Sequence, residues 1–197
     1  LLWTRTAPLP AFRHDPIHGD VAFCNSILAA HLGWTDARNV GSQSVRFADG
    51  VPRLYDETLM YNLRFGEFVK HPDEEIWALC AKLGMSRDLL GKPDYDVGFM
   101  GEKIPYSDRV VVQIARILLS SVDLVLLAGS LDGIGERHME RVIKVLHELI
   151  DNRGLPILES ELGETPLALR KPKTVIVSSK LYHVEDLADS VLSLDES

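Results

Sequence analysis

Apolar side chains recur at helical spacing in two segments of the first half of the chain. The first segment runs from a capping residue, Asp56 or Thr58, to Phe65. The second covers residues 73–83 and stops before Gly84, a residue type that commonly ends helices. Its apolar positions form one face, made of Ile76, Leu79, Cys80 and Leu83. The pattern predicts two helices that each bury one face.

The second half of the chain alternates longer helices with short apolar runs. Residues 108–121 are apolar nearly all round a helix, and we expect Ser107 or Asp108 to cap it. Residues 123–129 form an unbroken apolar run, which is typical of a parallel strand covered on both faces. Residues 136–152 form the clearest helix. Its apolar face consists of Met139, Val142, Ile143, Leu146, Leu149 and Ile150.

Shorter strand patterns complete the series. Residues 40–54 alternate weakly around a turn at residues 49–50, and residues 173–179 form a β-branched strand. A short helix near residues 184–188 and a last strand at residues 190–194 follow. Because helices and strands alternate, the pattern predicts an α/β fold with a mostly parallel sheet and right-handed crossovers.

Three segments lack a regular period. Residues 1–20 contain three prolines and are expected to form an extended or irregular lead-in. Residues 86–106 are dense in glycine and proline, which predicts an irregular surface loop. Residues 155–172 form a polar, proline-bearing insertion. Loops of such length are often functional, so the lead-in and the insertion are candidate contact surfaces.

Composition and charge narrow the class of protein. The chain has 197 residues, of which 46% are hydrophobic and 25% charged, as expected for one soluble globular domain. Its net charge of −8 argues against a nucleic-acid-binding protein, which needs a basic face. No apolar run approaches the roughly 18 residues that a membrane-spanning helix needs. We therefore expect protein partners.

The residues that usually hold metals are scattered. Cys24 and Cys80 stand far apart, so they favour neither a zinc site nor a disulfide, and they fit a reducing compartment. His138 and His147 are nine residues apart, which places them on opposite sides of a helix. Paired acidic residues are typical of solvated faces. The sequence predicts no metal site and no acid–base pair.

The glycine spacing does not match a phosphate-binding P-loop. The single Gly-Lys pair, Gly91-Lys92, precedes Pro93, and Ser86 stands where a P-loop needs its first glycine.

A dinucleotide-binding fingerprint comes closer, because Gly133 and Gly135 follow a buried strand and precede a helix. His138 occupies the third glycine position, where a bulky side chain obstructs helix packing. The motif is more typical of a glycine-rich connecting loop.

Several segments follow one another in a characteristic order. They are residues 15–21 (DPIHGDV), 52–63 (PRLYDETLMYNL), 73–84, 109–119, 123–127, 173–179 and 189–194. In this order they resemble the nucleotide-binding domain of ATP-binding cassette (ABC) proteins, especially of the exporter type, from about Asp15 onward. The stretch at residues 52–63, which resembles the segment after the family's Q-loop, is the most specific.

The resemblance implies an ABC-ATPase-like, P-loop NTPase-like core with a small helical subdomain at about residues 58–118. The whole chain, residues 1–197, is then one degenerate ABC-type domain. In that register the P-loop falls at or before residue 1. Because no methionine starts the chain, we expect its true N-terminus to lie upstream.

The resemblance also places the family's functional positions. They fall on Gly50 (Q-loop glutamine), Ile104, Pro105, Tyr106, Ser107 and Asp108 (signature), Ala128 (Walker B aspartate), Gly129 (general base) and Ser179 (switch histidine). Gln43 lies seven residues from the Q-loop position. Pro105 lacks an N–H donor, and alanine and glycine can neither hold a metal nor activate water. The resemblance therefore implies the fold without ATP hydrolysis, and no cofactor or metal is expected.

Three functions follow as hypotheses. The first is a catalytically inactive structural or accessory subunit of a larger protein assembly. The second is a degenerate nucleotide-binding domain whose residues 50–101 contact a transmembrane partner. The third, weaker hypothesis is a dinucleotide-dependent oxidoreductase that uses the Gly133 and Gly135 loop. We expect an intracellular location, either in an organelle such as the mitochondrion or peripheral on a membrane complex, and the sequence leaves this choice open.

Overall fold

The computed structural model describes residues 2–4, 45–66, 70–158, 163, 165–179 and 190–192. The sequence-based predictions for residues 15–21, Cys24, Gln43 and the helix near residues 184–188 lie outside these ranges.

The sheet has five strands in the order β2-β3-β4-β1-β5. Their bounds are Leu2–Thr4 (β1), Val45–Ala48 (β2), Leu124–Ala128 (β3), Thr174–Ser178 (β4) and Ser190–Leu192 (β5). β3 pairs in parallel with β2 on one side and with β4 on the other, and Leu124 lies opposite Val45 and Thr174. β1 pairs antiparallel with β4 and β5. The predicted mixed α/β class with a parallel core is confirmed. β1 runs antiparallel to the strands of this core.

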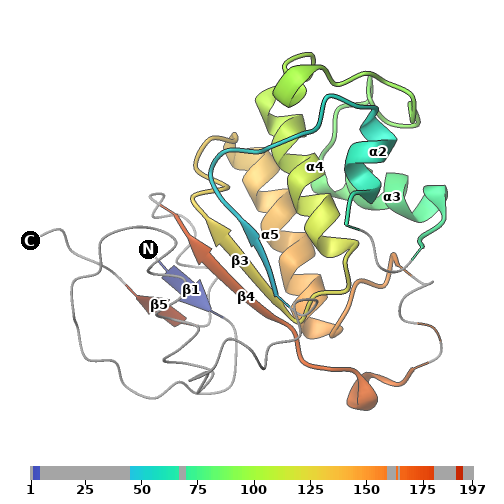
Figure 1. Ribbon diagram of the computed structural model, residues 1–197. Coiled ribbons are helices and arrows are strands. Elements are labelled where there is room, and N and C mark those ends of the chain that lie inside the picture. The colour runs from blue at the N-terminus through green and yellow to red at the C-terminus, as the bar shows by residue number, and fades with distance from the viewer. Residues whose placement is uncertain are drawn as a thin grey trace, which may run out of the picture.

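The helices pack against one face of the parallel strands (Figure 1). They are α2 (Leu59–Arg64), α3 (Asp73–Leu83), α4 (Tyr106–Leu118) and α5 (Glu136–Asp151), with short 3-10 helices at Phe99–Gly101 and Leu167–Leu169. α4 contacts β2 and α5 contacts β4, while α2 packs on α4, and α3 packs on α4 and α5. α4 therefore connects the sheet to the smaller helices.

The two predicted helices of the first half are confirmed. The Thr58 hydroxyl caps α2 by accepting the Tyr61 N–H at 3.2 Å. α3 buries the four apolar residues that form its predicted face, and Gly84 ends it with a φ of 101°. A side chain at that φ would be strained, so glycine suits the position.

The predicted start of α4 is wrong. The helix begins at Tyr106 directly after Pro105, and neither Ser107 nor Asp108 caps it. Proline is well suited to a helix start, because its missing N–H would have no partner there and its φ is already close to the helical value. The Asp108 side chain is buried and accepts the Ser86 N–H at 2.8 Å. Asp108 thus links α4 to the turn after α3.

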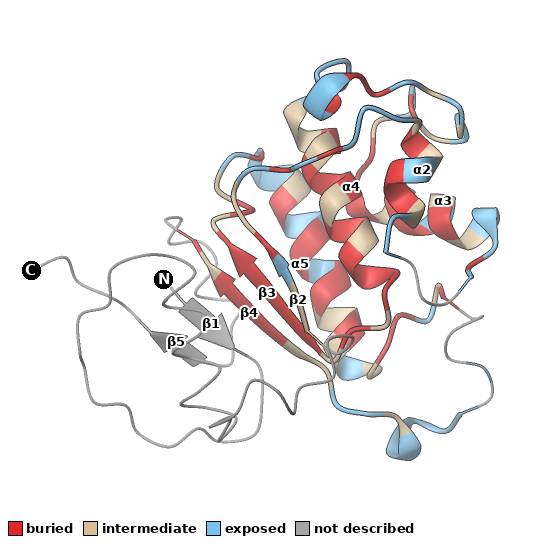
Figure 2. Ribbon diagram, in the orientation of Figure 1, coloured by how far each residue is buried: buried red, intermediate tan, exposed pale blue. Residues whose placement is uncertain are grey.

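The core is continuous from the sheet to the small helices (Figure 2). All five residues of β3 are buried, and so is the predicted face of α5 apart from the half-buried Ile150. Burial raises the pKa of the Cys80 thiol to about 12, so Cys80 acts as a small neutral core residue.

Residues 86–106 are largely irregular, as predicted, but they are more than a surface loop. Leu89, Val97 and Ile104 are buried in the main core.

Among the described residues, no helix combines the length and apolar character needed to cross a bilayer.

Candidate functional site at the ends of the parallel strands

The three parallel strands end at the same edge of the sheet. β2, β3 and β4 finish at Ala48, Ala128 and Ser178. Ala128 lies opposite Ser178, and Ala48 lies opposite Leu127, one residue before the end of β3. In open α/β sheets, ligands bind outside the carboxyl ends of the strands. This edge is therefore the candidate functional site.

Hydrogen bonds tie the strand ends to one another. The buried Ser130 hydroxyl lies 2.8 Å from the Ala48 carbonyl oxygen, to which it donates. The Gly129 N–H donates to the Ser178 carbonyl oxygen at 3.0 Å. The loops that follow β2, β3 and β4 are thus held together at the edge by the protein's own groups.

Asp132 supplies a carboxylate at this edge, and Ser179 binds it. The turn after β3 closes when the Asp132 N–H donates to the Gly129 carbonyl oxygen at 3.2 Å. The buried Ser179 hydroxyl donates to the Asp132 Oδ1 atom at 2.5 Å. Ser179, which the resemblance aligned with the switch histidine, therefore orients an aspartate that the sequence analysis did not single out.

The Tyr106 ring fills the space beside the strand ends. Its hydroxyl donates to the Gly50 carbonyl oxygen at 2.8 Å. A Cβ atom at Gly133 would lie 2.5 Å from the Tyr106 Cε1 atom, so a residue with a side chain does not fit there unless the ring moves. Gly50 also approaches Gly129 closely, since a Cβ atom at Gly50 would lie 3.2 Å from the Gly129 carbonyl oxygen. Three of the positions given by the resemblance, Gly50, Tyr106 and Gly129, thus meet at one edge.

The remaining signature positions lie elsewhere. Ile104 is a core residue, Pro105 is exposed, and Ser107 is half-buried in the first turn of α4. Asp108 is held by the Ser86 N–H, as described above. The glycine-rich loop also has a packing role, because Gly133 accommodates the Tyr106 ring. The sequence shows that position 133 is a glycine. Residue spacing alone does not identify the Tyr106 ring as the neighbour that requires a glycine there.

The chemistry available at the edge is limited. Ala128 and Gly129 contribute no side-chain oxygen that could bind a metal or activate water. The hydroxyls of Tyr106, Ser130 and Ser179 all donate to acceptors within the protein. Among the residues that the structure describes, no group of three or more His, Cys, Asp or Glu side chains is arranged to hold a metal ion.

Comparison with known proteins gives partial matches. No protein-family model matches the chain. It is 28% identical over 133 residues to the mitochondrial iron-sulfur clusters transporter ABCB7 of Danio rerio, which covers 62% of this chain and 17% of that protein. It is also 39% identical over 49 residues to a clavaminate synthase-like protein of Arabidopsis thaliana, which covers 25% of this chain and 15% of that protein.

Among solved structures, a bacterial Atm1-family ABC exporter with ATP bound superposes with a TM-score of 0.49 and 18% identity, over 54% of this chain and 19% of that one. The chain spans less than a fifth of the length of each of the two curated proteins. The sequence similarity to the Danio rerio transporter supports an ABC-transporter-related domain, the relation that the order of segments predicts.

Proposed function

We propose that the chain is a catalytically inactive ABC-type domain that serves as a structural or accessory subunit of a larger protein assembly. The observation that carries this proposal is the filled strand edge. The Tyr106 ring lies against Gly133 and is bound to Gly50, while Ala128 and Gly129 stand where the resemblance places the two catalytic carboxylates.

Phosphoryl transfer depends on positioning and on charge stabilisation. A metal ion needs oxygen ligands, and the attacking water needs a group that orients it. Neither alanine nor glycine supplies such a group. The hydroxyls at the edge are already hydrogen-bonded, so a substrate would have to replace internal bonds in order to bind them.

A binding role is supported by an exposed aromatic group, which we name the aromatic face: Tyr55, Tyr61 and Phe65. These side chains are 45%, 46% and 40% exposed. The ring centroids of Tyr55 and Phe65 are 4.3 Å apart, and Tyr61 lies 6.2 Å from each. Clustered exposed aromatic residues are typical of protein interfaces. The aromatic face is thus a surface through which an inactive domain would bind a subunit.

The aromatic face also favours a second candidate function. It lies within residues 50–101, which the resemblance assigns to contact with a transmembrane partner. In this alternative the chain is a degenerate nucleotide-binding domain docked on a membrane protein. The similar Danio rerio protein is described as a transporter, and as mitochondrial, which agrees with this alternative and with an organellar location.

Inactivity is tested by phosphate release from ATP in the presence of Mg²⁺. We expect the purified chain to give the same rate as a protein-free blank, because Ala128 and Gly129 replace the two catalytic carboxylates and the Asp132 carboxylate is bound by Ser179. The Ser107→Ala variant is expected to give this same rate. Turnover that Ser107→Ala abolishes, but that the exposed control Thr165→Ala leaves intact, would show that the chain is an enzyme after all.

The two candidate roles are distinguished by the native mass and composition of the complex that carries the chain in its own cells. We expect stoichiometric copurification with an assembly whose activity is not transport. Tyr61→Ser in the aromatic face should reduce recovery of the partner, whereas Glu140→Gln on the exposed side of α5 should not. Recovery with a membrane-spanning ABC partner would instead select the degenerate transporter domain.

A further inference from the structure

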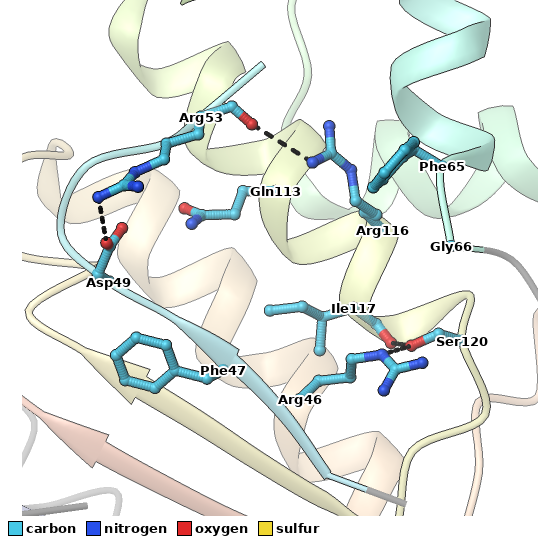
Figure 3. A pocket seen from close by; sticks show the side chains of 10 residues that line it. All are labelled: Arg46, Phe47, Asp49, Arg53, Phe65, Gly66, Gln113, Arg116, Ile117 and Ser120. Atoms are coloured by element: carbon cyan, nitrogen blue, oxygen red, sulfur yellow. Dashed lines mark hydrogen bonds and ion pairs between the residues drawn. The ribbon is translucent and has the colours of Figure 1, made fainter. Parts of the chain in front are cut away.

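The sheet ends at β2, and a cleft of about 430 Å³ runs along this end (Figure 3). β2 is the first strand in the sheet order and, among the described strands, it pairs with β3 alone. Arg46 and Phe47 both line the cleft, although neighbouring residues of a strand point to opposite faces of the sheet. A cleft that is lined from both faces of an edge strand lies along its free edge. Free strand edges can bind a further extended segment.

The backbone of β2 offers hydrogen-bonding groups at this edge. The Ala48 carbonyl oxygen accepts the hydroxyl of Ser130, which follows β3, so the backbone groups of Ala48 face β3. Successive residues of a strand direct their N–H and C=O groups to alternate edges, so those of Phe47 point away from β3. The Val45 carbonyl oxygen faces the same free edge and accepts from the Arg46 side chain at 3.1 Å. Phe47 therefore presents a backbone donor and a backbone acceptor to the cleft.

The opposite wall of the cleft comes from α4 and the end of α2. Ile117 contributes apolar surface, and Phe65, which is 40% exposed, lies at the end of α2. Gln113 extends into the same space in Figure 3, and its buried Oε1 atom has no hydrogen-bond partner within the described part of the chain. An amide donor that enters the cleft would satisfy this acceptor. Because Phe65 also belongs to the aromatic face, the cleft and the aromatic face form one continuous surface.

The charges of the cleft are spread along its length. Arg46, Arg53, Arg116 and Asp49 line it, which leaves a charge of +2, although the whole chain carries −8. The three arginine side chains point to separate places in Figure 3. Such an arrangement does not suit one small anion, but it suits carboxylates placed at intervals. In an extended peptide, side chains on the same face recur about every 6.6 Å. The charge therefore favours an acidic peptide that lies along β2.

We propose that the cleft binds an extended acidic peptide of a partner protein, which adds to β2 as a further strand. The peptide backbone bonds to the Phe47 N–H and carbonyl oxygen, which supplies affinity, and its acidic side chains supply specificity. The inference goes beyond the proposed function, since it adds a second contact and names the chemistry of the partner. It does not depend on catalytic inactivity, because the hydroxyls and glycines at the strand ends take no part. If the peptide does not bind, the measurement of ATP turnover is unaffected.

The test is calorimetric titration of the full chain with a blocked five-residue peptide of alternating glutamate and valine. We expect saturable one-to-one binding, and no binding of the counterpart in which lysine replaces glutamate. Two analogues, N-methylated on the glutamate amides or on the valine amides, each lack the donors of one peptide edge. One analogue should lose affinity at least about tenfold and the other should not, because only one edge faces β2. Arg53→Gln should weaken binding about threefold, and the exposed control Arg87→Gln should not.

Amide hydrogen exchange locates the bound peptide. Addition of the glutamate–valine peptide should slow exchange of the Phe47 N–H, which faces the free edge. Exchange of the Arg46 N–H, which faces β3 as that of Ala48 does, should stay the same.

Three results would overturn the proposal. One is the absence of saturable binding of the glutamate–valine peptide at millimolar concentration. Another is equal affinity of the two N-methylated analogues, which would show that no backbone edge is recognised. The third is slower exchange at Phe47 when the chain alone is concentrated, which would place a second copy of the chain at this edge. Circular dichroism of each variant verifies that it is folded.

Discussion

Asn62→Ala is expected to lower the free energy of unfolding by about 3 kcal/mol, because it removes a buried amide that makes several hydrogen bonds at once. The Asn62 side chain is fully buried on α2. Its Oδ1 atom accepts the Tyr55 N–H at 2.8 Å and an Arg116 nitrogen at 3.1 Å. Its Nδ2 atom donates to the Tyr55 and Thr58 carbonyl oxygens at 3.0 and 3.1 Å.

Alanine at this position removes all four of these side-chain bonds. The Tyr55 N–H would lose its acceptor, while the Tyr55 carbonyl oxygen would keep only the Glu57 N–H. Arg116 would keep its bond to the Asn62 carbonyl oxygen but lose the one to the side chain. An unsatisfied buried polar group costs about 1–3 kcal/mol, so the loss exceeds that of one ordinary hydrogen bond.

Urea unfolding followed by circular dichroism measures the effect. Asn62→Asp should also destabilise the fold, because it places a carboxylate oxygen against the Tyr55 and Thr58 carbonyl oxygens in a fully buried position. The exposed control Glu57→Ala should change the free energy of unfolding by no more than about 0.5 kcal/mol. A loss below about 1 kcal/mol in Asn62→Ala would mean that water replaces the amide at this site.

Much of the fold was predictable because burial imposes a local period. The faces of α3 and α5 and the fully buried β3 follow directly from apolar spacing, since each element buries residues that are near one another in sequence. The start of α4 was not predictable in this way. Asp108 is a strong capping residue type, but its carboxylate bonds to Ser86, which lies 22 residues earlier. A distant contact thus overrode a local signal.

The candidate sites show the same division. The resemblance assigned Gly50, Gly129 and Ser179 to functional positions of the family, and the structure places them just after the ends of β2, β3 and β4. The Ser179 to Asp132 bond joins residues 47 positions apart, and no spacing rule identifies it. The packing of α4 on β2 is equally nonlocal, since it brings the Arg46 side chain to the Ser120 hydroxyl, 74 positions later in the chain.

Gly133→Ala tests the filled edge through its dependence on Tyr106. In the unchanged chain we expect a loss of about 1–2 kcal/mol in the free energy of unfolding, because the new methyl group overlaps the ring. The ring cannot move aside without breaking its hydrogen bond to the Gly50 carbonyl oxygen. Gly133 does not have a positive φ, so alanine fits the backbone itself.

In a Tyr106→Ala background the same Gly133→Ala change should be neutral or stabilising by up to about 1 kcal/mol, because alanine reduces the entropy of the unfolded chain. Chemical unfolding of the four proteins of this double-mutant cycle therefore yields a coupling energy of about 1–3 kcal/mol. Gly135→Ala is the matched control, since a Cβ atom there meets nothing within 4 Å, and its effect should be equal in both backgrounds. A coupling energy near zero for Gly133 would place the Tyr106 ring away from the strand ends, and would remove the observation on which catalytic inactivity is proposed.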